Sequence, residues 1–442
     1  MNDRPGARGM LFRFSLYDFL KNQQYYEPFL ILAMRSAGLD FFAIGLLVGF
    51  REIAINVMEV PSGALADLWG RRRAMMLSFV AFIASFAVFA FSSHFAHFLA
   101  AMALFAVGAV FRTGTHKAMI FDYLRREGLA DQKTRYYGTT RSWAKFGSAV
   151  SVVLASTLVF FVAAVDPDGR DAYRWVFLAS IVPYLGGLVN FWSYPSYLDG
   201  TAESAPSVTG IFGHLWQVGR QSLAAGRLRG LLGESMGFEG VWKVARSYLQ
   251  PIVRSAALAL PLLAGFDDVQ RTAVMIGAVY VVLHLLESAA SRRSEGFSLR
   301  MGGLEPSAGR LWWLNLATYG AMAAGLAADW HTQGTVAGLG LAVAIGGFVL
   351  LAFLQNLWRP IHLGRFDEAT DADRGATVLS VESQAKSLFA AVLAPLLGLA
   401  VDASLALREG RHDPASFLPV AAAGLAAAGL AMALRARRGR VG

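Results

Sequence analysis

Basic side chains occur at seven positions inside segments that are otherwise apolar. Two of them, Arg141 and Lys145, are four residues apart and therefore share one face of a helix. Cations that converge on one cavity would attract an anionic solute such as a carboxylate or a phosphate ester. If each cation instead pairs with a nearby Glu, of which the same segments hold several, the cavity is close to neutral. The seven are Lys21, Arg112, Arg141, Lys145, Lys243, Arg246 and Lys386.

Carboxylates in the same apolar segments are candidates for proton coupling, because a buried carboxyl group can exchange a proton near neutral pH. Glu27, which precedes Pro28, could carry a proton or pair with Lys21 or Lys243. Glu59 could serve either in coupling or in structure. Both alternatives stay open for each residue.

His284 and Glu287 are three residues apart, so they share a helix face. Such a pair can exchange a proton near neutral pH or form a structural hydrogen bond. Aromatic and amide side chains beside the cations, namely those of Tyr25, Tyr26 and Gln250, could bind an organic solute or simply pack.

The composition excludes a soluble protein. Of the 442 residues 55% are hydrophobic and 16% are charged, against about 25% charged in an average soluble domain. The mean hydropathy is +0.45. The apolar content excludes a disordered chain, and the absence of Cys excludes a disulfide-stapled secreted protein.

Motifs for other chemistry are absent from the sequence. It has no Walker loop and no glycine-rich nucleotide loop, so no cofactor and no self-contained ATP-driven pump is expected. His94 and His97 fit an interfacial position better than a metal site, and no metal site is predicted. The net charge of +9 is concentrated in connections between apolar stretches, which argues against nucleic-acid binding.

The apolar stretches predict an all-α polytopic membrane protein with 12 transmembrane helices, since a spanning helix needs about 20 apolar residues. The predicted spans are 14–36, 41–66, 74–93, 95–123, 136–164, 175–194, 231–262, 268–291, 311–328, 334–360, 376–401 and 415–434.

Lys and Arg are concentrated in alternate connections, for example 71–73, 125–135, 292–300 and 435–440. Because basic loops stay on the cytoplasmic side, both termini are predicted to be cytoplasmic. The basic N-terminus is not followed by a short apolar core with a cleavage site, so no cleaved signal peptide is expected. The predicted location is the cytoplasmic (inner) membrane.

The two halves of the sequence repeat each other. Lys21 and Pro28 of the first span correspond to Lys243 and Pro251 of the seventh. Ser142–Lys145 of the fifth span likewise correspond to Ser383–Lys386 of the eleventh. Two pseudo-symmetric six-helix halves with a site at their midplane are typical of secondary transporters.

The repeat defines the predicted domains. They are an N-terminal bundle 1–194, a cytoplasmic linker 195–230 and a C-terminal bundle 231–442. Within the linker, Ile211, Leu215, Val218 and Ala225 fall on one face, which predicts a short amphipathic helix on the membrane surface.

The third, sixth, ninth and twelfth predicted spans contain no charged residue, whereas nearly all the others contain several. A charge that faces lipid costs about 2.5–3.5 kcal/mol on insertion scales. Every third helix can therefore face lipid while the rest surround something polar. Lys145 and Lys386 lie about 15 Å deep in their helices, too far for easy snorkelling to the surface.

The segment Glu59–Arg73 resembles the signature loop of the major facilitator superfamily, with Leu68 in place of the usual Arg. Phe111–Thr115 is similar to a second family motif, and the glycine-proline antiporter motif is missing at Gly147–Ser151. The resemblance extends over the whole chain and implies transport by alternating access.

The loop also has a physical interpretation. Gly63 would allow close helix approach, Gly70 a tight turn, and Asp67 acceptance from the N-terminus of the eleventh span. Arg71 or Arg72 would reach Asp122. Together these six residues would form a gate that holds the two halves together.

We therefore expect a secondary active transporter, not an enzyme, that moves a small organic solute across the lipid bilayer. Proton coupling is expected, with export favoured over uptake, and the chain is expected to act as a monomer. The alternatives are an organic-anion uptake symporter or exchanger, a non-transporting receptor, and a membrane-embedded transferase.

Overall fold

The computed structural model describes residues 5–113, 115–166, 170–199, 208–259, 263–332, 337–370, 375–408 and 414–438. All regular structure in these ranges is helical, and no strand occurs in them, which confirms the predicted all-α class. By their contacts the helices form two compact units. Unit 1 comprises residues 1–37 and 53–212, and unit 2 comprises residues 38–52 and 213–442.

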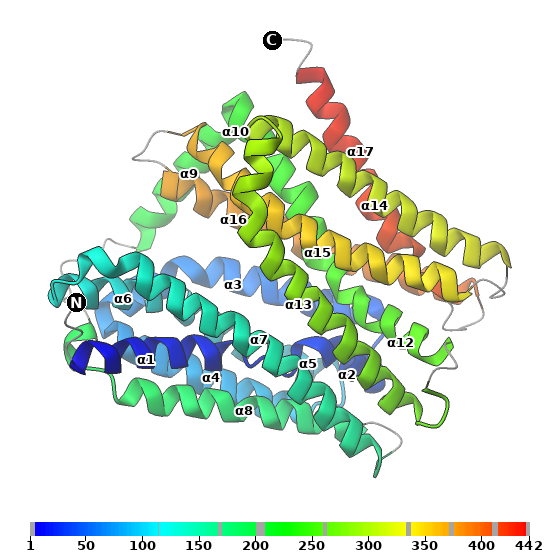
Figure 1. Cartoon of the computed structure of the whole chain (residues 1–442), viewed down its shortest axis with the longest axis horizontal. Helices are drawn as coiled ribbons and strands as arrows, with labels where there is room; N and C mark the ends of the chain where they lie inside the picture. Colours follow the sequence, from blue (N-terminus) through cyan, green and yellow to red (C-terminus); the bar gives the residue numbers. More distant parts are fainter. Residues whose placement is uncertain are drawn as a thin grey trace. The chain divides into compact units, whose positions relative to one another are not determined.

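The first half of the sequence forms the helices of unit 1 and one helix that is shared with unit 2 (Figure 1). They are α1 (Pro5–Lys21), α2 (Leu30–Ser36), the shared α3 (Phe41–Trp69), α4 (Arg71–Ala90), α5 (Phe95–Arg112), α6 (Thr115–Arg126), α7 (Lys133–Ala163) and α8 (Arg170–Trp192).

The second half begins with α9 (Val208–Ala224), which crosses the boundary between the units. The helices of unit 2 that follow are α10 (Gly226–Ser235), α11 (Val241–Ala245), α12 (Leu249–Ala259), α13 (Asp268–Arg300), α14 (Leu304–Thr332), α15 (Ala337–Asp367), α16 (Gly375–Ala406) and α17 (Leu418–Arg438).

The predicted spans match these helices in order. In the described part of the chain, nine helices are long and apolar enough to cross a membrane. The other three predicted spans correspond to α14 and to two interrupted helices, α1–α2 and α10–α12. The tenth span was predicted to end at residue 360 but continues to Asp367, because a Pro at position 360 is accommodated inside α15.

The two units repeat one packing scheme. In unit 1, α4 packs against α5 and α8, and in unit 2 the corresponding α14 packs against α15 and α17. Similarly, α1 lies against α7 and α8, while α11 lies against α16 and α17. The internal repeat seen in the sequence is therefore also a repeat of helix contacts.

The first span of each repeat is interrupted near its lysine. α1 ends at Lys21, a non-helical segment follows, and a single 3-10 turn, η1 (Glu27–Phe29), leads into α2. In the seventh span a π-helical turn, η4 (Met236–Gly240), separates α10 from α11, and a 3-10 turn, η5 (Arg246–Tyr248), precedes α12. Pro28 and Pro251, which lack an N–H, contribute to both interruptions.

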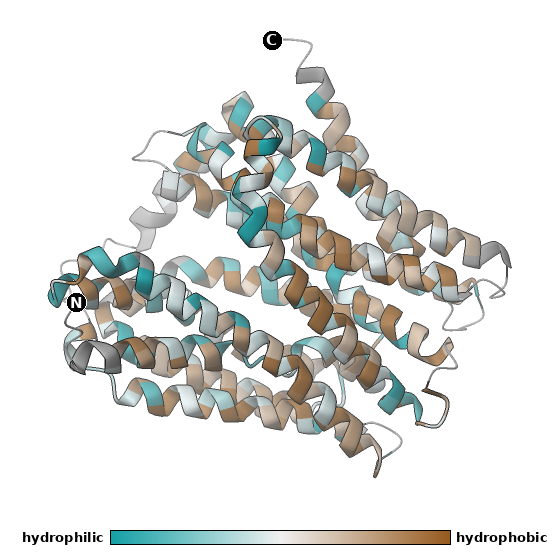
Figure 2. Ribbon diagram, viewed as in Figure 1, coloured by the Kyte–Doolittle hydropathy of each residue, from teal (hydrophilic) through white to brown (hydrophobic). Residues whose placement is uncertain are grey.

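Hydrophobic residues occur along most of the helices (Figure 2), and many of the large ones are exposed. On α8 the large hydrophobic residues Trp175, Val182 and Val189 are all more than half exposed, and on α17 Leu430 is 63% exposed. A soluble protein rarely exposes so much apolar surface, whereas a lipid bilayer covers it favourably. α8 and α17, which correspond to two of the predicted spans without charged residues, therefore have the exposed apolar surface expected of a lipid-facing helix.

The linker helix α9 packs on protein where its side chains are described. Val218 is buried against Leu231, Phe366 and Val378 of unit 2. Residues of α10, α15 and α16 cover this part of its apolar face. Its position on the membrane surface stays a prediction. The side chains of residues 211 and 215 lie outside the described residues.

The first part of α3 belongs to unit 2 and approaches α16 at backbone distance. A Cβ atom on Gly398 of α16 would lie 2.2 Å from the carbonyl oxygen of Phe41, and one on Gly45 of α3 would lie 2.5 Å from the oxygen of Ala394. Asp402 fixes the same contact by accepting from the backbone N–H groups of Phe41 (3.1 Å) and the next residue (2.7 Å).

Replacing Gly398 by Ala is expected to destabilise the protein by about 1–3 kcal/mol, because the added methyl group meets backbone that cannot rotate away. The unfolding temperature in detergent measures this. Gly346→Ala is the matched control, since a Cβ there meets no atom within 4 Å. An equal response of the two variants would contradict the close contact.

Candidate functional site

The turn between α3 and α4 is built around Gly70. Its φ of +100° lies in the left-handed region that favours glycine. A Cβ on Gly70 would lie 3.1 Å from the Asp199 carboxylate, which accepts from the backbone N–H of Arg72 at 3.0 Å. The Arg72 guanidinium also donates to the carbonyl oxygen of Tyr194 at 2.9 Å. Asp199, which the sequence placed only in the linker, thus satisfies the N-terminus of α4.

Replacing Asp199 by Ala is expected to cost about 1–2 kcal/mol of stability, as for the loss of a helix cap. The unfolding temperature of the purified protein should fall accordingly. Asp131→Ala removes an exposed carboxylate of the same unit and should leave it unchanged. A fall no larger than that of the control would remove Asp199 from this role.

For the other residues of the signature loop, the structure shows the expected contact at Arg71 only. The Arg71 guanidinium is paired with Asp122 of α6, the contact expected from the sequence. Gly63 is exposed, and a Cβ there would meet no described atom within 4 Å, so the close helix approach expected at this position stays a prediction. The side chain of Asp67 lies outside the described residues.

The interruption between α1 and η1 is held by side-chain amides. Gln23 donates to the carbonyl oxygen of Gly147 in α7 at 3.0 Å, and Asn22 donates to that of Asp18 at 2.7 Å. Gly147 is needed here, because a Cβ would lie 2.7 Å from the carbonyl oxygen of Phe19. Lys21 lies in the last turn of α1, with its ammonium group 5.9 Å from the centroid of the Tyr17 ring.

Arg112, the last residue of α5, is the centre of a polar cluster in unit 1. Its guanidinium carbon lies 4.6 Å from the centroid of the Phe82 ring, and one of its nitrogens donates to the hydroxyl of Tyr184 at 3.4 Å. Among the described residues no carboxylate lies within ion-pair distance of this half-buried cation.

Beside this cation lies a second group of buried polar atoms. His116 of α6 is 7% exposed, and its Nδ1 lies 3.9 Å from an oxygen of Asp18. Its ring is stacked obliquely against that of Tyr17, with centroids 3.9 Å apart. The Nε2 of His116 and the hydroxyl of Tyr17 are buried and have no partner among the described atoms. Such unpaired groups are costly, by about 1–3 kcal/mol each, and are concentrated at functional sites.

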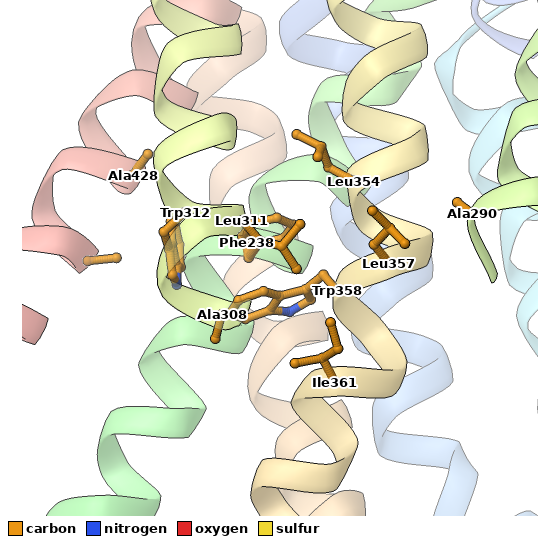
Figure 3. Close-up of a cluster of buried hydrophobic side chains, with 11 residues drawn as sticks. Phe238, Ala290, Ala308, Leu311, Trp312, Leu354, Leu357, Trp358, Ile361 and Ala428 are labelled. Carbon is orange, nitrogen blue, oxygen red and sulfur yellow. The ribbon is translucent and has the colours of Figure 1, made fainter. Parts of the chain in front are cut away.

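In unit 2 the π-helical turn η4 is held by aromatic packing. Phe238 stacks on Trp358 of α15 at 4.2 Å and meets Trp312 of α14 edge-on at 5.0 Å (Figure 3). Its carbonyl oxygen accepts from the side-chain amide of Gln355 at 2.6 Å. π-helical turns are often found at functional sites.

The predicted cation Lys386 is neutralised within unit 2. Its ammonium group lies 2.7 Å from Glu239 and 2.8 Å from Glu382. Arg359 of α15 contacts the same two carboxylates, at 3.1 and 2.8 Å. Glu382, whose side chain is fully buried, also accepts from Ser235 at 2.7 Å. Two cations and two carboxylates therefore balance here.

A second network lies one helical turn away. Arg365 contacts Glu234 at 2.8 Å and Glu305 at 2.9 Å, and Arg435 contacts the same two carboxylates. Trp312 donates to Glu234 at 3.1 Å. This network joins α10, α14, α15 and α17, so it fixes the end of unit 2 that is richest in arginine.

Lys243 is also paired, with Glu52 of α3 at 2.5 Å, and Arg51 contacts the same carboxylate at 3.0 Å. The predicted pair His284–Glu287 is in contact at 3.2 Å. These contacts assign no role in transport. They show that Lys243 forms an ion pair with a carboxylate of unit 2.

The remaining candidates differ in how far they are buried. Tyr26 is buried against the rings of Phe86 and Phe105, and Gln250 is buried in α12. The following are half-buried or, for Arg141, exposed: Tyr25, Glu27, Glu59, Arg141 and Lys145.

Several residues of the clusters were not singled out from the sequence. One signal was available: Arg359, His362 and Arg365 recur every three residues and so share a helix face. Arg365 and Arg435 were taken only as markers of orientation. Asp18 and His116 carried no local signal, because their partnership depends on the packing of α1 against α6.

Comparison with known proteins assigns the family. The model of the Major Facilitator Superfamily matches residues 22–362. The chain belongs to this superfamily. A facilitator-type membrane protein of this kind is a transporter and not an enzyme, so the transferase alternative is excluded. A search of curated protein sequences gives no significant match.

Solved structures of other members show the same fold. The nucleoside transporter NupG (D323A mutant) has a TM-score of 0.74 at 13% identity, covering 96% of this chain and 99% of that one. A bacterial homolog of the human lysosomal transporter Spinster, inward-facing and unoccupied, has a TM-score of 0.67 at 15% identity, with coverages of 98% and 96%. A D-xylose-proton symporter has 0.56 at 14%, with coverages of 96% and 96%. These similarities confirm the fold with 12 helices in two six-helix halves.

Proposed function

We propose that this transporter is proton-coupled and moves a small organic anion by alternating access, with the solute bound at the Arg112 cluster of unit 1. Its location would be the cytoplasmic membrane, with both termini in the cytoplasm, and it would act as a monomer. The proposed halves are 1–194 and 231–442, joined by 195–230.

The observation that carries this proposal is a difference between the predicted cations: those compared in unit 2 have a carboxylate partner, and Arg112 in unit 1 has none within ion-pair distance among the described residues. Lys243 and Lys386 each have a carboxylate partner in unit 2. Arg112 instead has an aromatic ring and a tyrosine hydroxyl beside it. A guanidinium offers a carboxylate or phosphate two parallel hydrogen bonds, so this cation suits an anionic solute. The interruption of α1 beside the cluster is typical of solute sites in transporters.

Neighbouring groups support proton coupling at the same place. Asp18 and His116 lie 3.9 Å apart, and the ring of His116 lies against that of Tyr17. A proton gained by either group would raise the positive charge felt by a bound anion. We add them to the coupling candidates Glu27, Glu59, His284 and Glu287.

Export remains the proposed direction, supported by the family resemblance of the signature loop. We propose that Gly63, Asp67, Gly70, Arg71, Arg72 and Asp122 act as its gate. The lack of a carboxylate beside Arg112 also favours the second candidate, an organic-anion uptake symporter or exchanger. Both candidates share the same site and differ in the direction in which protons and solute move.

Purified protein in proteoliposomes tests the proposal. A panel of radiolabelled carboxylates, phosphate monoesters and organic cations is offered under an imposed pH gradient, while an internal dye reports pH. We expect the flux of an anion to be coupled to a flux of protons. For an exporter the protons move in the direction opposite to the anion, and for an uptake symporter they move in the same direction. Binding without flux would favour a receptor, and flux of organic cations alone would contradict the anionic site.

A further inference from the structure

A further binding feature is formed within unit 2 alone. It is a cavity of about 690 Å³ with one wall on α10 and η4 and the other on α17, and Phe389 of α16 at its back. Its volume lies in the range of ligand pockets. The glycines of the first wall keep it open, because a Cβ on Gly233 would meet no atom within 4 Å.

The two ends of this cavity differ in polarity. The α17 wall consists of Ala427, Leu430 and Leu434, and these two leucines are 63% and 44% exposed. At the other end are the guanidinium groups of Arg229 and Arg435, with Glu234. The cavity is therefore amphipathic, with a basic mouth and an apolar interior.

The charge at the mouth is not balanced. Arg435 is already paired with Glu234 at 2.8 Å, and Glu234 is shared with Arg365. Arg229 is exposed and, within the described part of the chain, donates only to the carbonyl oxygen of Leu223, at 3.5 Å. Its charge is therefore available to attract an anion.

We propose that this cavity binds an anionic phospholipid from the surrounding bilayer, with its phosphate on Arg229 and an acyl chain along the leucines of α17. The exposed leucines of a membrane-spanning helix are in contact with lipid, so a lipid reaches the cavity directly. Basic pockets between transmembrane helices recognise anionic head groups in this way. The leaflet would be the cytoplasmic one, which rests on the proposed orientation of the chain.

Bound there, the lipid bridges α10 to α17 beside the network of Glu234, Arg365 and Arg435. Since a ligand that binds only the folded state stabilises it, the lipid is expected to raise the unfolding temperature. The site needs neither a transported solute nor a proton gradient, so its test is independent of the proposed function.

The test is a titration of the purified, detergent-solubilised protein, with the unfolding temperature as the readout. The probes are dioleoylphosphatidylglycerol, dioleoylphosphatidylcholine and the water-soluble glycerol 3-phosphate. We expect phosphatidylglycerol to give the largest rise. Arg229→Gln should raise its half-maximal concentration about tenfold, and Gly233→Leu, which fills the cavity, should abolish the rise.

Arg292→Gln is the matched control, because Arg292 is exposed in the same unit and, among the described residues, forms hydrogen bonds only with Ser288. It should respond to phosphatidylglycerol as the unmodified protein does. Equal rises with the two lipids, an equal rise with glycerol 3-phosphate alone, or equal responses of the two arginine variants would overturn the proposal. Counting lipids retained by each variant in native mass spectrometry decides the case if Gly233→Leu is too unstable to titrate.

Discussion

Replacing Arg112 by Gln is expected to lower anion transport in proteoliposomes by about 100-fold, the loss that follows when one partner of a buried charged contact is removed. The guanidinium is half-buried and lies over the Phe82 ring, beside the hydroxyl of Tyr184. No described carboxylate lies within ion-pair distance of it, so under the proposed function the bound anion would be its partner. The initial rate of uptake of the panel anion with the largest flux measures the effect.

Two further variants make this prediction specific. Arg112→Lys keeps the charge but loses the paired donors of the guanidinium, so an intermediate loss of about tenfold is expected. Lys117→Gln removes an exposed cation of α6, which lies over the rings of Phe121 and Tyr137, and should transport normally. Unchanged transport by Arg112→Gln would place the solute elsewhere.

Glu382→Gln is expected to cause the largest loss of stability, about 3 kcal/mol or more, which corresponds to a fall of about 5 °C in unfolding temperature. The fully buried carboxylate contacts Arg359 and Lys386, both at 2.8 Å. Its neutralisation leaves these two cations with Glu239 alone. Breaking a buried network in this way costs more than the network contributes, because an unpaired charge remains inside the protein.

A double variant distinguishes this charge effect from a loss of packing. Adding Lys386→Met to Glu382→Gln removes the excess cation, so part of the stability should return. The control is Glu368→Gln, which breaks an exposed pair with Arg227 and should cost less than about 1 kcal/mol. If the double variant is less stable than Glu382→Gln by the full cost of Lys386→Met alone, the two charges are not coupled.

The order and number of helices could be predicted because lipid imposes them. Each span needs a long apolar stretch, and basic residues mark alternate connections, so both signals are local in sequence. The match between Lys21–Pro28 and Lys243–Pro251 also predicted which spans are equivalent. It did not predict that both are interrupted, because a proline alone does not tell whether a helix bends or breaks.

The site was harder to predict, because charge balance depends on which helices are neighbours. Lys386 and Arg112 look alike in sequence, each a cation in an apolar segment. Only packing shows that Lys386 lies between two carboxylates while Arg112 faces aromatic rings. Asp18 and His116 meet for the same reason, since they are distant in sequence and belong to different helices.

If the protein works by alternating access at this site, the interrupted first span is exposed to each side of the membrane in turn. Cysteine labelling tests this exposure directly. The chain has no Cys, so a single introduced thiol is uniquely labelled. Gln24→Cys places one in the non-helical segment beside the Arg112 cluster, and Val182→Cys places a control on an exposed apolar position of α8. Each is treated with a membrane-impermeant thiol reagent in right-side-out and in inverted vesicles. The account predicts that position 24 is labelled from both sides and is protected by the transported anion, while position 182 is labelled from neither. Labelling of position 24 from one side only, whatever solute is present, would contradict alternating access at this site.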